Sequence, residues 1–340
     1  SAAPGEVART GAVFAFSVLP TIIFFSSLMA VTYHLGVMQR AVRASAWVMQ
    51  RTMKTSGAES LSAAGNVFVG QTEAPLLVRP FVEKMTESEL MALMTGGFAT
   101  VAGGVLAAYV GMLVAYFPDV AGHMLAASVM SAPAALVVAK IMLPEAGEPE
   151  TAQSLDVVVE KPDVNVIDAA ARGAGEGLTL ALNVGAMLLA FVALIYMSNG
   201  ILGWIGALVG FDGLTLELIL GWILAPLAWV MGVPWADAPF IGSLMGIKTV
   251  LNEFVAYLQL AGAMGETTIG MPGGLAQRSV IIATYALSGF ANFGSIAMQI
   301  AGIGGIAPSR RQDLSRLGLR AMIGGSIAAF MTATVAGMIL

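Results

Sequence analysis

The sequence has no cysteine, few histidines and little charge, and each shortage excludes a class of site. Without cysteine the chain can form neither disulfides nor thiolate metal sites, and it has no cysteine nucleophile. His34 and His123 are far apart in sequence, which argues against a histidine metal site or a catalytic triad. Only 11% of the residues are charged, against roughly 25% in soluble domains, while 57% are hydrophobic and the mean hydropathy is +0.83. The composition predicts an all-α polytopic membrane protein.

The stretch Gly57–Pro80 is apolar, yet it carries polar residues near its middle: Asn66, Gln71, Thr72 and Glu73. A helix needs about 20 residues to cross the hydrocarbon core, so this stretch could form one crossing or two half-crossings that turn at Gly65–Gly70. Basic pairs flank the crossing segment Ala58–Val78 on both sides, Arg51 with Lys54 and Arg79 with Lys84. Since basic residues prefer the cytoplasmic side, we expect a re-entrant hairpin with its polar tip near mid-membrane. Non-helical backbone at that depth must be buried or line a wet cavity, so the tip is a predicted ligand site.

The other apolar runs predict further membrane segments. Residues 39–55 carry arginines among apolar side chains, a pattern typical of an amphipathic helix on the cytoplasmic surface, with an ordinary basic loop as the alternative. Residues 141–172 are polar and acidic and predict a cytoplasmic linker. In chain order we also expect a span at 11–38, a broken or closely packed span at 90–117, spans at 120–139 and 177–211, an interfacial segment at 214–233, a second polar hairpin at 234–262, a broken span at 279–308 and a last span at 321–340.

This order of segments occurs twice, in a first repeat at 1–140 and a second at 173–340. The broken spans match in letters, GGFATVAG beside SGFANFGS, which aligns Phe98 with Phe290 and Thr100 with Asn292. No lysine or arginine lies between Arg172 and Lys248, so residues 199–240 are expected to face outward and the second hairpin to enter from the opposite face. Inverted repeats with discontinuous helices are typical of secondary transporters.

Glu73 and Glu253 place one carboxylate at each predicted hairpin tip. An ionisable residue inside a membrane span is a functional candidate, although these carboxylates could instead form a buried structural ion pair, for example Glu253 with Lys248 or with an arginine elsewhere. Lys248 could equally be a structural lysine at the hairpin tip. Uncharged donors and acceptors accompany the carboxylates: Asn66, Gln71, Thr72, Asn292 and Ser295. Such a set suits a neutral, hydroxyl-rich ligand, whereas phosphorylated ligands would need a basic cluster that the sequence lacks.

Three further side chains have two interpretations each. Phe290 and Phe293 flank Asn292, and aromatic residues at this spacing pack more often than they touch ligand. Thr100 and the carbonyls around it could coordinate a hard cation such as sodium, or its hydroxyl could bond back to its own helix. The residues alone leave both questions open.

Four motifs closely resemble the concentrative nucleoside transporters, in the branch of sodium-coupled bacterial and animal members. They are GAESLSAAGNVFVGQTEAPLLVRP, MTGGFATVAGGVL, KTVLNEFVAY and SGFANFGSIAMQIAGIGGIAP, in the family's order, and the resemblance runs from about residue 11 to the end. It implies substrate contacts at Gly70, Gln71, Thr72 and Glu73 with Val105 beside the nucleobase, at Glu253, Asn292 and Ser295 for the ribose, and at nearby Phe290. It also implies a sodium site at Asn66, Val69, Thr100 and Val101, with the valines contributing backbone oxygens.

The resemblance implies a homotrimer with eight spans per chain, of which this sequence is expected to lack the first two; its first residue is Ser, not Met. The spans 11–38 and 177–211 would form a static scaffold and the trimer interface. We therefore expect an integral protein of a bacterial inner membrane that imports nucleosides with co-transported sodium by alternating access. Its partners would be nucleoside and lipid, with no nucleic acid. The alternatives are proton coupling through Glu73 or Glu253, or a gated channel for small polar solutes. No metal triad or nucleophile–base pair supports an enzyme.

Overall fold

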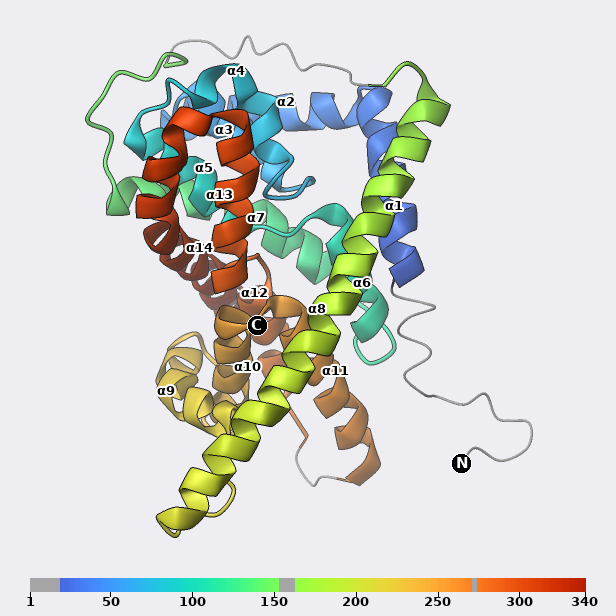
Figure 1. Cartoon of the computed structure of the whole chain (residues 1–340), viewed down its shortest axis with the longest axis vertical. Helices are drawn as coiled ribbons and strands as arrows, with labels where there is room; N and C mark the ends of the chain where they lie inside the picture. Colours follow the sequence, from blue (N-terminus) through green and yellow to red (C-terminus); the bar gives the residue numbers. More distant parts are fainter. Residues whose placement is uncertain (1–18, 153–162, 271–273) are drawn as a thin grey trace.

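The computed structural model describes residues 19–152, 163–270 and 274–340, which fold into an assembly of helices (Figure 1). The predicted all-helical class is confirmed for these residues. The elements are α1 (Leu19–His34), α2 (Val37–Met53), α3 (Gly57–Asn66), η2 (Ala74–Val78), α4 (Arg79–Val82), α5 (Glu87–Ala99), α6 (Gly103–Leu113), α7 (Val120–Met142), α8 (Val166–Leu208), α9 (Leu216–Val230), α10 (Ala238–Val250), α11 (Glu253–Gly270), α12 (Gln277–Leu287), α13 (Phe293–Ile306), η3 (Pro308–Arg310) and α14 (Arg311–Ile339).

Helix α8 is long and runs obliquely beside α1 (Figure 1). Its 43 residues extend about 65 Å at 1.5 Å per residue. Small residues allow the close approach: a Cβ on Gly173 would lie 2.7 Å from the carbonyl oxygen of Ser26 in α1. The helix begins inside the expected linker because the Asn165 side chain accepts hydrogen bonds from the amides of Ile167 and Asp168 and so caps it.

Residues 37–53 form a helix, not a basic loop. Helix α2 leaves α1 at an angle of 76°, and the turn uses Gly36 at φ +79°. Its buried side chains, Val42, Ala46 and Met49, repeat at helical spacing along one face. The helix is amphipathic as predicted, and its position on the cytoplasmic surface of a bilayer stays a prediction.

The first hairpin segment (α3, η2 and α4) has two unequal legs. Helix α3 contains 10 residues, the length expected of a half-crossing, and a capping box of Ser56 and Glu59 fixes its start. The second leg is a short 3₁₀ helix followed by a single α turn, because Pro75 and Pro80 have no backbone N–H to donate. Whether this segment re-enters the membrane stays a prediction.

Two helices are broken where the sequence predicts. Thr100–Ala102 interrupts α5 and α6, and residues 288–292 interrupt α12 and α13. The breaks touch each other: a Cβ on Gly289, which has φ +93°, would lie 2.7 Å from the carbonyl oxygens of Phe98 and Ala99. The backbones of the two breaks therefore lie against each other, although the inverted symmetry of the repeats stays a prediction.

Within the described residues, three helical stretches are long and apolar enough to cross a membrane by themselves. They are Glu87–Leu113, Val120–Met142 and Pro308–Ile339, and the bent pair α1–α2 passes the same test together. These stretches contain most or all of the spans expected at 90–117, 120–139 and 321–340. All but the last three residues of the span expected at 177–211 lie in α8, which ends at Leu208 and contains the shorter apolar stretch Val192–Leu208.

Candidate functional site

The carboxylate of Glu253 is held by one donor at each oxygen. Glu253 is the first residue of α11 and is buried, at 4% exposure. The Tyr109 hydroxyl on α6 donates to its Oε1 at 2.9 Å, and Nδ2 of Asn292 donates to its Oε2 at 3.0 Å. Each carboxylate oxygen can accept more than one hydrogen bond, so the group stays able to accept from a ligand.

Asn292 is oriented by its own helix. As the N-cap of α13 it accepts the amide of Ser295 through Oδ1 at 2.8 Å, which turns Nδ2 toward Glu253. A helix cap thus aims the side chain that holds the carboxylate. The break in the second repeat is the local structure that makes this possible, because only a helix start at this point leaves the Ser295 amide free.

Gln71 connects the first hairpin segment to α13. Its Nε2 donates to Oγ of Ser295 at 3.2 Å, and its Oε1 accepts from Nε2 of Gln299 at 3.0 Å. Gln299 also donates to the carbonyl of Met94 in α5, at 3.1 Å. The structure therefore joins Gln71, Ser295, Asn292 and Glu253 in one chain of hydrogen bonds.

The other predicted substrate contacts lie around this chain. Val105 is buried on α6, and Phe290 is partly buried in the second break. Thr72 lies against α13, since a Cβ on Gly302 would meet its Cγ2 at 3.0 Å. Gly70 and Glu73 line a cavity of about 460 Å³. The hydrogen bonds of the described residues therefore do not tie Glu73 to the chain that contains Gln71.

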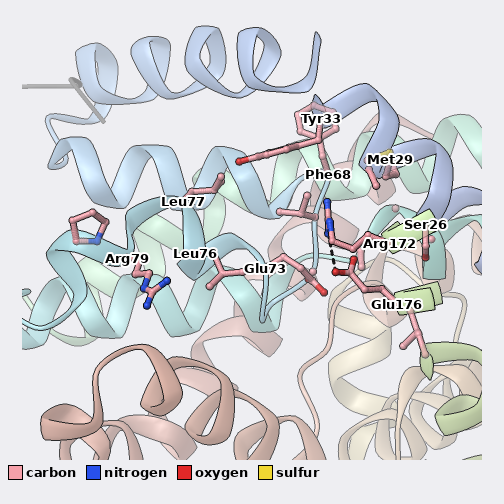
Figure 2. A pocket seen from close by; sticks show the side chains of 18 residues that line it. Ser26, Met29, Tyr33, Phe68, Glu73, Leu76, Leu77, Arg79, Arg172 and Glu176 are labelled. Atoms are coloured by element: carbon pink, nitrogen blue, oxygen red, sulfur yellow. Dashed lines mark hydrogen bonds and ion pairs between the residues drawn. The ribbon is translucent and has the colours of Figure 1, made fainter. Parts of the chain in front are cut away.

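This cavity lies between the first hairpin segment and the helices α1 and α8, and Figure 2 shows Glu73 facing it together with Tyr33 and Arg172. Arg172 donates to both oxygens of Asp163 at 2.6 and 2.9 Å and to Glu176 at 2.7 Å. These hydrogen bonds from the guanidinium hold the pKa of Asp163 below its usual value. The network fixes the start of α8 beside the cavity.

Asn66 has unused polar atoms at the first break. Within the described part of the chain, neither Oδ1 nor Nδ2 of this buried side chain has a hydrogen-bond partner. A Cβ on Gly96 would lie 3.3 Å from Nδ2, and the Thr100 hydroxyl donates to the Gly96 carbonyl at 2.8 Å, which is the back-bonding interpretation. Lone pairs of the Thr100 oxygen stay available. Val101 is buried beside it and Val69 is partly buried in the hairpin turn.

Two family models match the chain. Residues 123–337 match the model described as the C-terminus of Na+ dependent nucleoside transporters, and residues 15–116 match the model described as nucleoside recognition. The chain belongs to the concentrative nucleoside transporter family. The family consists of membrane transporters and not of enzymes.

Individual relatives agree with this assignment. An uncharacterized transporter of Haemophilus influenzae is 48% identical over 332 residues, covering 97% of this chain and 78% of that protein. The sodium/nucleoside cotransporter 1 of rat is 44% identical, covering 96% of this chain and 51% of that protein. CNTnw, solved in an inward-facing substrate-bound state, has a TM-score of 0.87 at 49% identity, covering 96% of this chain and 75% of that one; variants of it have been solved in outward-facing and intermediate states.

Two polar residues of this transporter's hydrogen-bond chain were not predicted. Tyr109 lies one helical turn after Val105, and Gln299 lies one turn after Ser295. Residues four apart share a face of a helix, so this spacing is the signal that could have found both. Tyr109 also packs against the ring of Tyr257, with centroids 4.5 Å apart.

The ion pair considered for Glu253 is not formed. Lys248, also a described residue, donates through its ammonium to the carbonyl oxygens of Ala286 and Ser288, both at 2.9 Å, and not to Glu253. Glu253 keeps its two neutral donors, Tyr109 and Asn292. Lys248 thus has partners of its own at the second break, and the structural interpretation of its role stays a prediction.

Proposed function

We propose that this transporter is a sodium-coupled symporter that imports nucleosides by alternating access. The observation that carries the proposal is the Glu253 carboxylate, held by Tyr109 and Asn292 and connected through Ser295 to Gln71. A buried carboxylate with spare acceptor capacity suits vicinal hydroxyls, because charge-assisted hydrogen bonds are about twice as strong as neutral ones. Glu253, Asn292 and Ser295 would hold the ribose, with Phe290 nearby.

The nucleobase would lie toward the first hairpin segment. Gln71 offers an amide that both donates and accepts, as the edge of a base requires, and Val105 offers an apolar wall. In this structure the two polar atoms of the Gln71 side chain form hydrogen bonds with Ser295 and Gln299. A base would have to replace at least one of these bonds. Binding of the base would therefore change the contact between the first hairpin segment and α13. Gly70, Thr72 and Glu73 would complete this end.

Sodium would bind at the first break. The side-chain oxygen of Asn66, the hydroxyl of Thr100 and backbone oxygens of Val69 and Val101 are the kind of ligands that sodium takes at unwound helices. The support is the buried Oδ1 of Asn66, which has no hydrogen-bond partner within the described residues. Such atoms cost free energy unless something satisfies them. An ion bound between the turn of the first hairpin segment and the first break would order both of them. The nucleoside would then bind to a site that is already formed.

The cavity beside Glu73 would be the cytoplasmic approach to the site. It opens between the first hairpin segment and the helices α1 and α8, near the basic residues Arg79 and Arg172.

The helices α1 and α8 would form the static scaffold and the trimer interface, and the membrane would be a bacterial inner membrane. Mass measurement in detergent should give a trimer, and monomer alone at micromolar protein would contradict that assembly.

Uptake of radiolabelled uridine into proteoliposomes tests the proposal. An inward sodium gradient at fixed pH should concentrate uridine inside, and choline in place of sodium should abolish this accumulation. Full uptake in choline buffer under a proton gradient alone would show that protons, and not sodium ions, drive the transport. Equilibration without accumulation under either gradient would favour a channel.

A further inference from the structure

Lys248 is a buried cation at the second helix break. It lies in the last turn of α10, and its side chain is 1% exposed. Helix α10 packs beside α12 (Figure 1). Its ammonium donates to the carbonyl oxygens of Ala286 and Ser288 at 2.9 Å each and lies 5.9 Å from the ring centre of Phe330. A lysine is rarely buried to this degree without partners for its charge, so the position calls for a specific explanation.

The break itself supplies that explanation. Helix α12 ends at Leu287, so Ala286 contributes one of the last carbonyls of a helix, which lack intrahelical partners, and the Ser288 carbonyl belongs to the break. The C-terminal end of a helix also carries partial negative charge, which a cation stabilises. An ammonium or a metal ion could do this.

The first break shows the contrasting solution. There the residue at the end of the hairpin helix is the neutral Asn66, whose polar atoms have no partner among the described residues. In the second repeat the residue in the last turn of the hairpin helix is Lys248, and its partners are the carbonyls of the break. The first hairpin thus places the Asn66 amide, which has no hydrogen-bond partner among the described residues, at its break. The second hairpin places the Lys248 ammonium, which has hydrogen-bond partners, at its break.

We propose that the side-chain ammonium of Lys248 takes the place of a free cation at the second break. By holding the two ends of the break together, it positions Glu253 and Asn292 for the ribose. This proposal rests on the proposed function only for the identity of the ligand. Lys248 ties the end of α10 to the end of α12, while Glu253 begins the next helix after α10 and Asn292 caps the next helix after α12. The contact therefore sets the distance between the two elements whose side chains meet at the carboxylate.

The consequence is that the second break needs no ion from solution. Sodium dependence would belong to the first break alone, where Asn66 lies. Lys248 is a positioning residue in this account: it does not touch the ligand, and its loss would act through the geometry of Glu253.

The test uses Lys248→Met, which keeps the length of the side chain and removes its charge. Uridine affinity, measured by calorimetry in saturating sodium, should fall about tenfold or more, whereas affinity for 2′,3′-dideoxyuridine, which lacks the hydroxyls that Glu253 would hold, should fall much less. Lys140→Met is the matched control. Lys140 is paired with Glu59 and Glu145 and not with the carbonyls of the second break, so any effect of its loss should be equal for both ligands. Uridine binding within about twofold of wild type in Lys248→Met would overturn the proposal, and so would equal losses for both ligands.

A second variant separates charge from folding and from the identity of the ligand. Because the chain has no cysteine, Lys248→Cys introduces a unique thiol, which can be converted to an aminoethyl or a propyl mixed disulfide of equal length and verified by mass. The charged adduct should have the higher melting temperature and the tighter uridine binding. Equal melting temperatures would overturn the proposal even if uridine proves not to be a ligand. Failure of wild type to bind uridine would count against the proposed function alone.

Discussion

The hydroxyl of Tyr109 and the carboxylate of Glu253 lie 2.9 Å apart, although 144 residues separate them in sequence. The bond joins α6, which follows the first break, to α11, which follows the end of α10. Both partners are buried, so the bond forms away from bulk water. It ties the helix after one break directly to the carboxylate that we assign to the ribose.

Tyr109→Phe should weaken uridine binding by about tenfold, because it removes a hydrogen bond to a charged group and keeps the ring. The aromatic packing against Phe254 and Tyr257 would stay, so any loss of thermal stability should come from the one buried hydrogen bond to Glu253. Dideoxyuridine should lose less affinity than uridine. Calorimetry with both ligands measures this, and an unchanged uridine affinity would show that Tyr109 does not hold Glu253 for the ligand.

Asn66→Ala should raise the sodium concentration needed for half-maximal uridine binding by at least about tenfold, since each 1.4 kcal/mol of lost binding free energy is a factor of ten. The substitution removes the unpartnered buried oxygen that we assign to sodium. Ser62→Ala is a control on the same helix, where another buried polar atom is removed farther from the break. A sodium titration of uridine binding that is identical in wild type and Asn66→Ala would exclude Asn66 as a ligand.

Gly289→Ala should destabilise the protein by more than about 1 kcal/mol, because its positive φ strains any side chain. The new Cβ would also lie 2.7 Å from the carbonyl oxygens of Phe98 and Ala99 and would push the two breaks apart. Gly305→Ala in α13 is the control, since a Cβ there meets nothing within 4 Å. Thermal unfolding in detergent compares the two, and equal melting temperatures would contradict the contact between the breaks.

Much of this arrangement could be predicted from sequence, but its side-chain partners could not. The glycine and threonine letters of GGFATVAG and SGFANFGS predicted both breaks, since these residues weaken a helix locally. The resemblance to the family named Gln71, Glu253, Asn292 and Ser295, which the structure joins. Tyr109 and Gln299 were missed because their partners come from other helices, and only tertiary packing sets those distances.

Local chemistry explains the remaining differences. Asn165 caps α8 and starts it inside the expected linker, and the prolines after Glu73 shorten the second leg of the first hairpin segment. Glu73 faces a cavity beside α1 and α8, and apolar patterning carries no information about which way such a side chain turns.

Asp163 predicts a pH dependence at the start of α8. Hydrogen bonds from Arg172 lower its pKa in the folded protein, so this carboxylate stabilises the fold above its unfolded pKa of about 3.9. That contribution is lost as the pH falls through the lower, folded value. Asp163→Asn should therefore melt earlier than wild type at pH 7, and the difference should shrink as the pH falls below about 4. A difference that is constant from pH 7 to pH 3 would contradict the ionic pairing.

The central claim is that Glu253 holds the ribose and Gln71 holds the nucleobase. Calorimetric binding of uridine, 2′,3′-dideoxyuridine and adenosine to Glu253→Gln and Gln71→Ala tests this claim most directly. Loss of a charged partner from a buried hydrogen bond costs about 1.5–3 kcal/mol, against about 0.5–1.5 kcal/mol for a neutral one. Glu253→Gln should therefore weaken uridine binding more than Gln71→Ala does, and its penalty should shrink for dideoxyuridine. Gln71→Ala should instead change the ranking of uridine against adenosine. Equal losses for uridine and dideoxyuridine in Glu253→Gln would contradict the assignment of this carboxylate to the ribose.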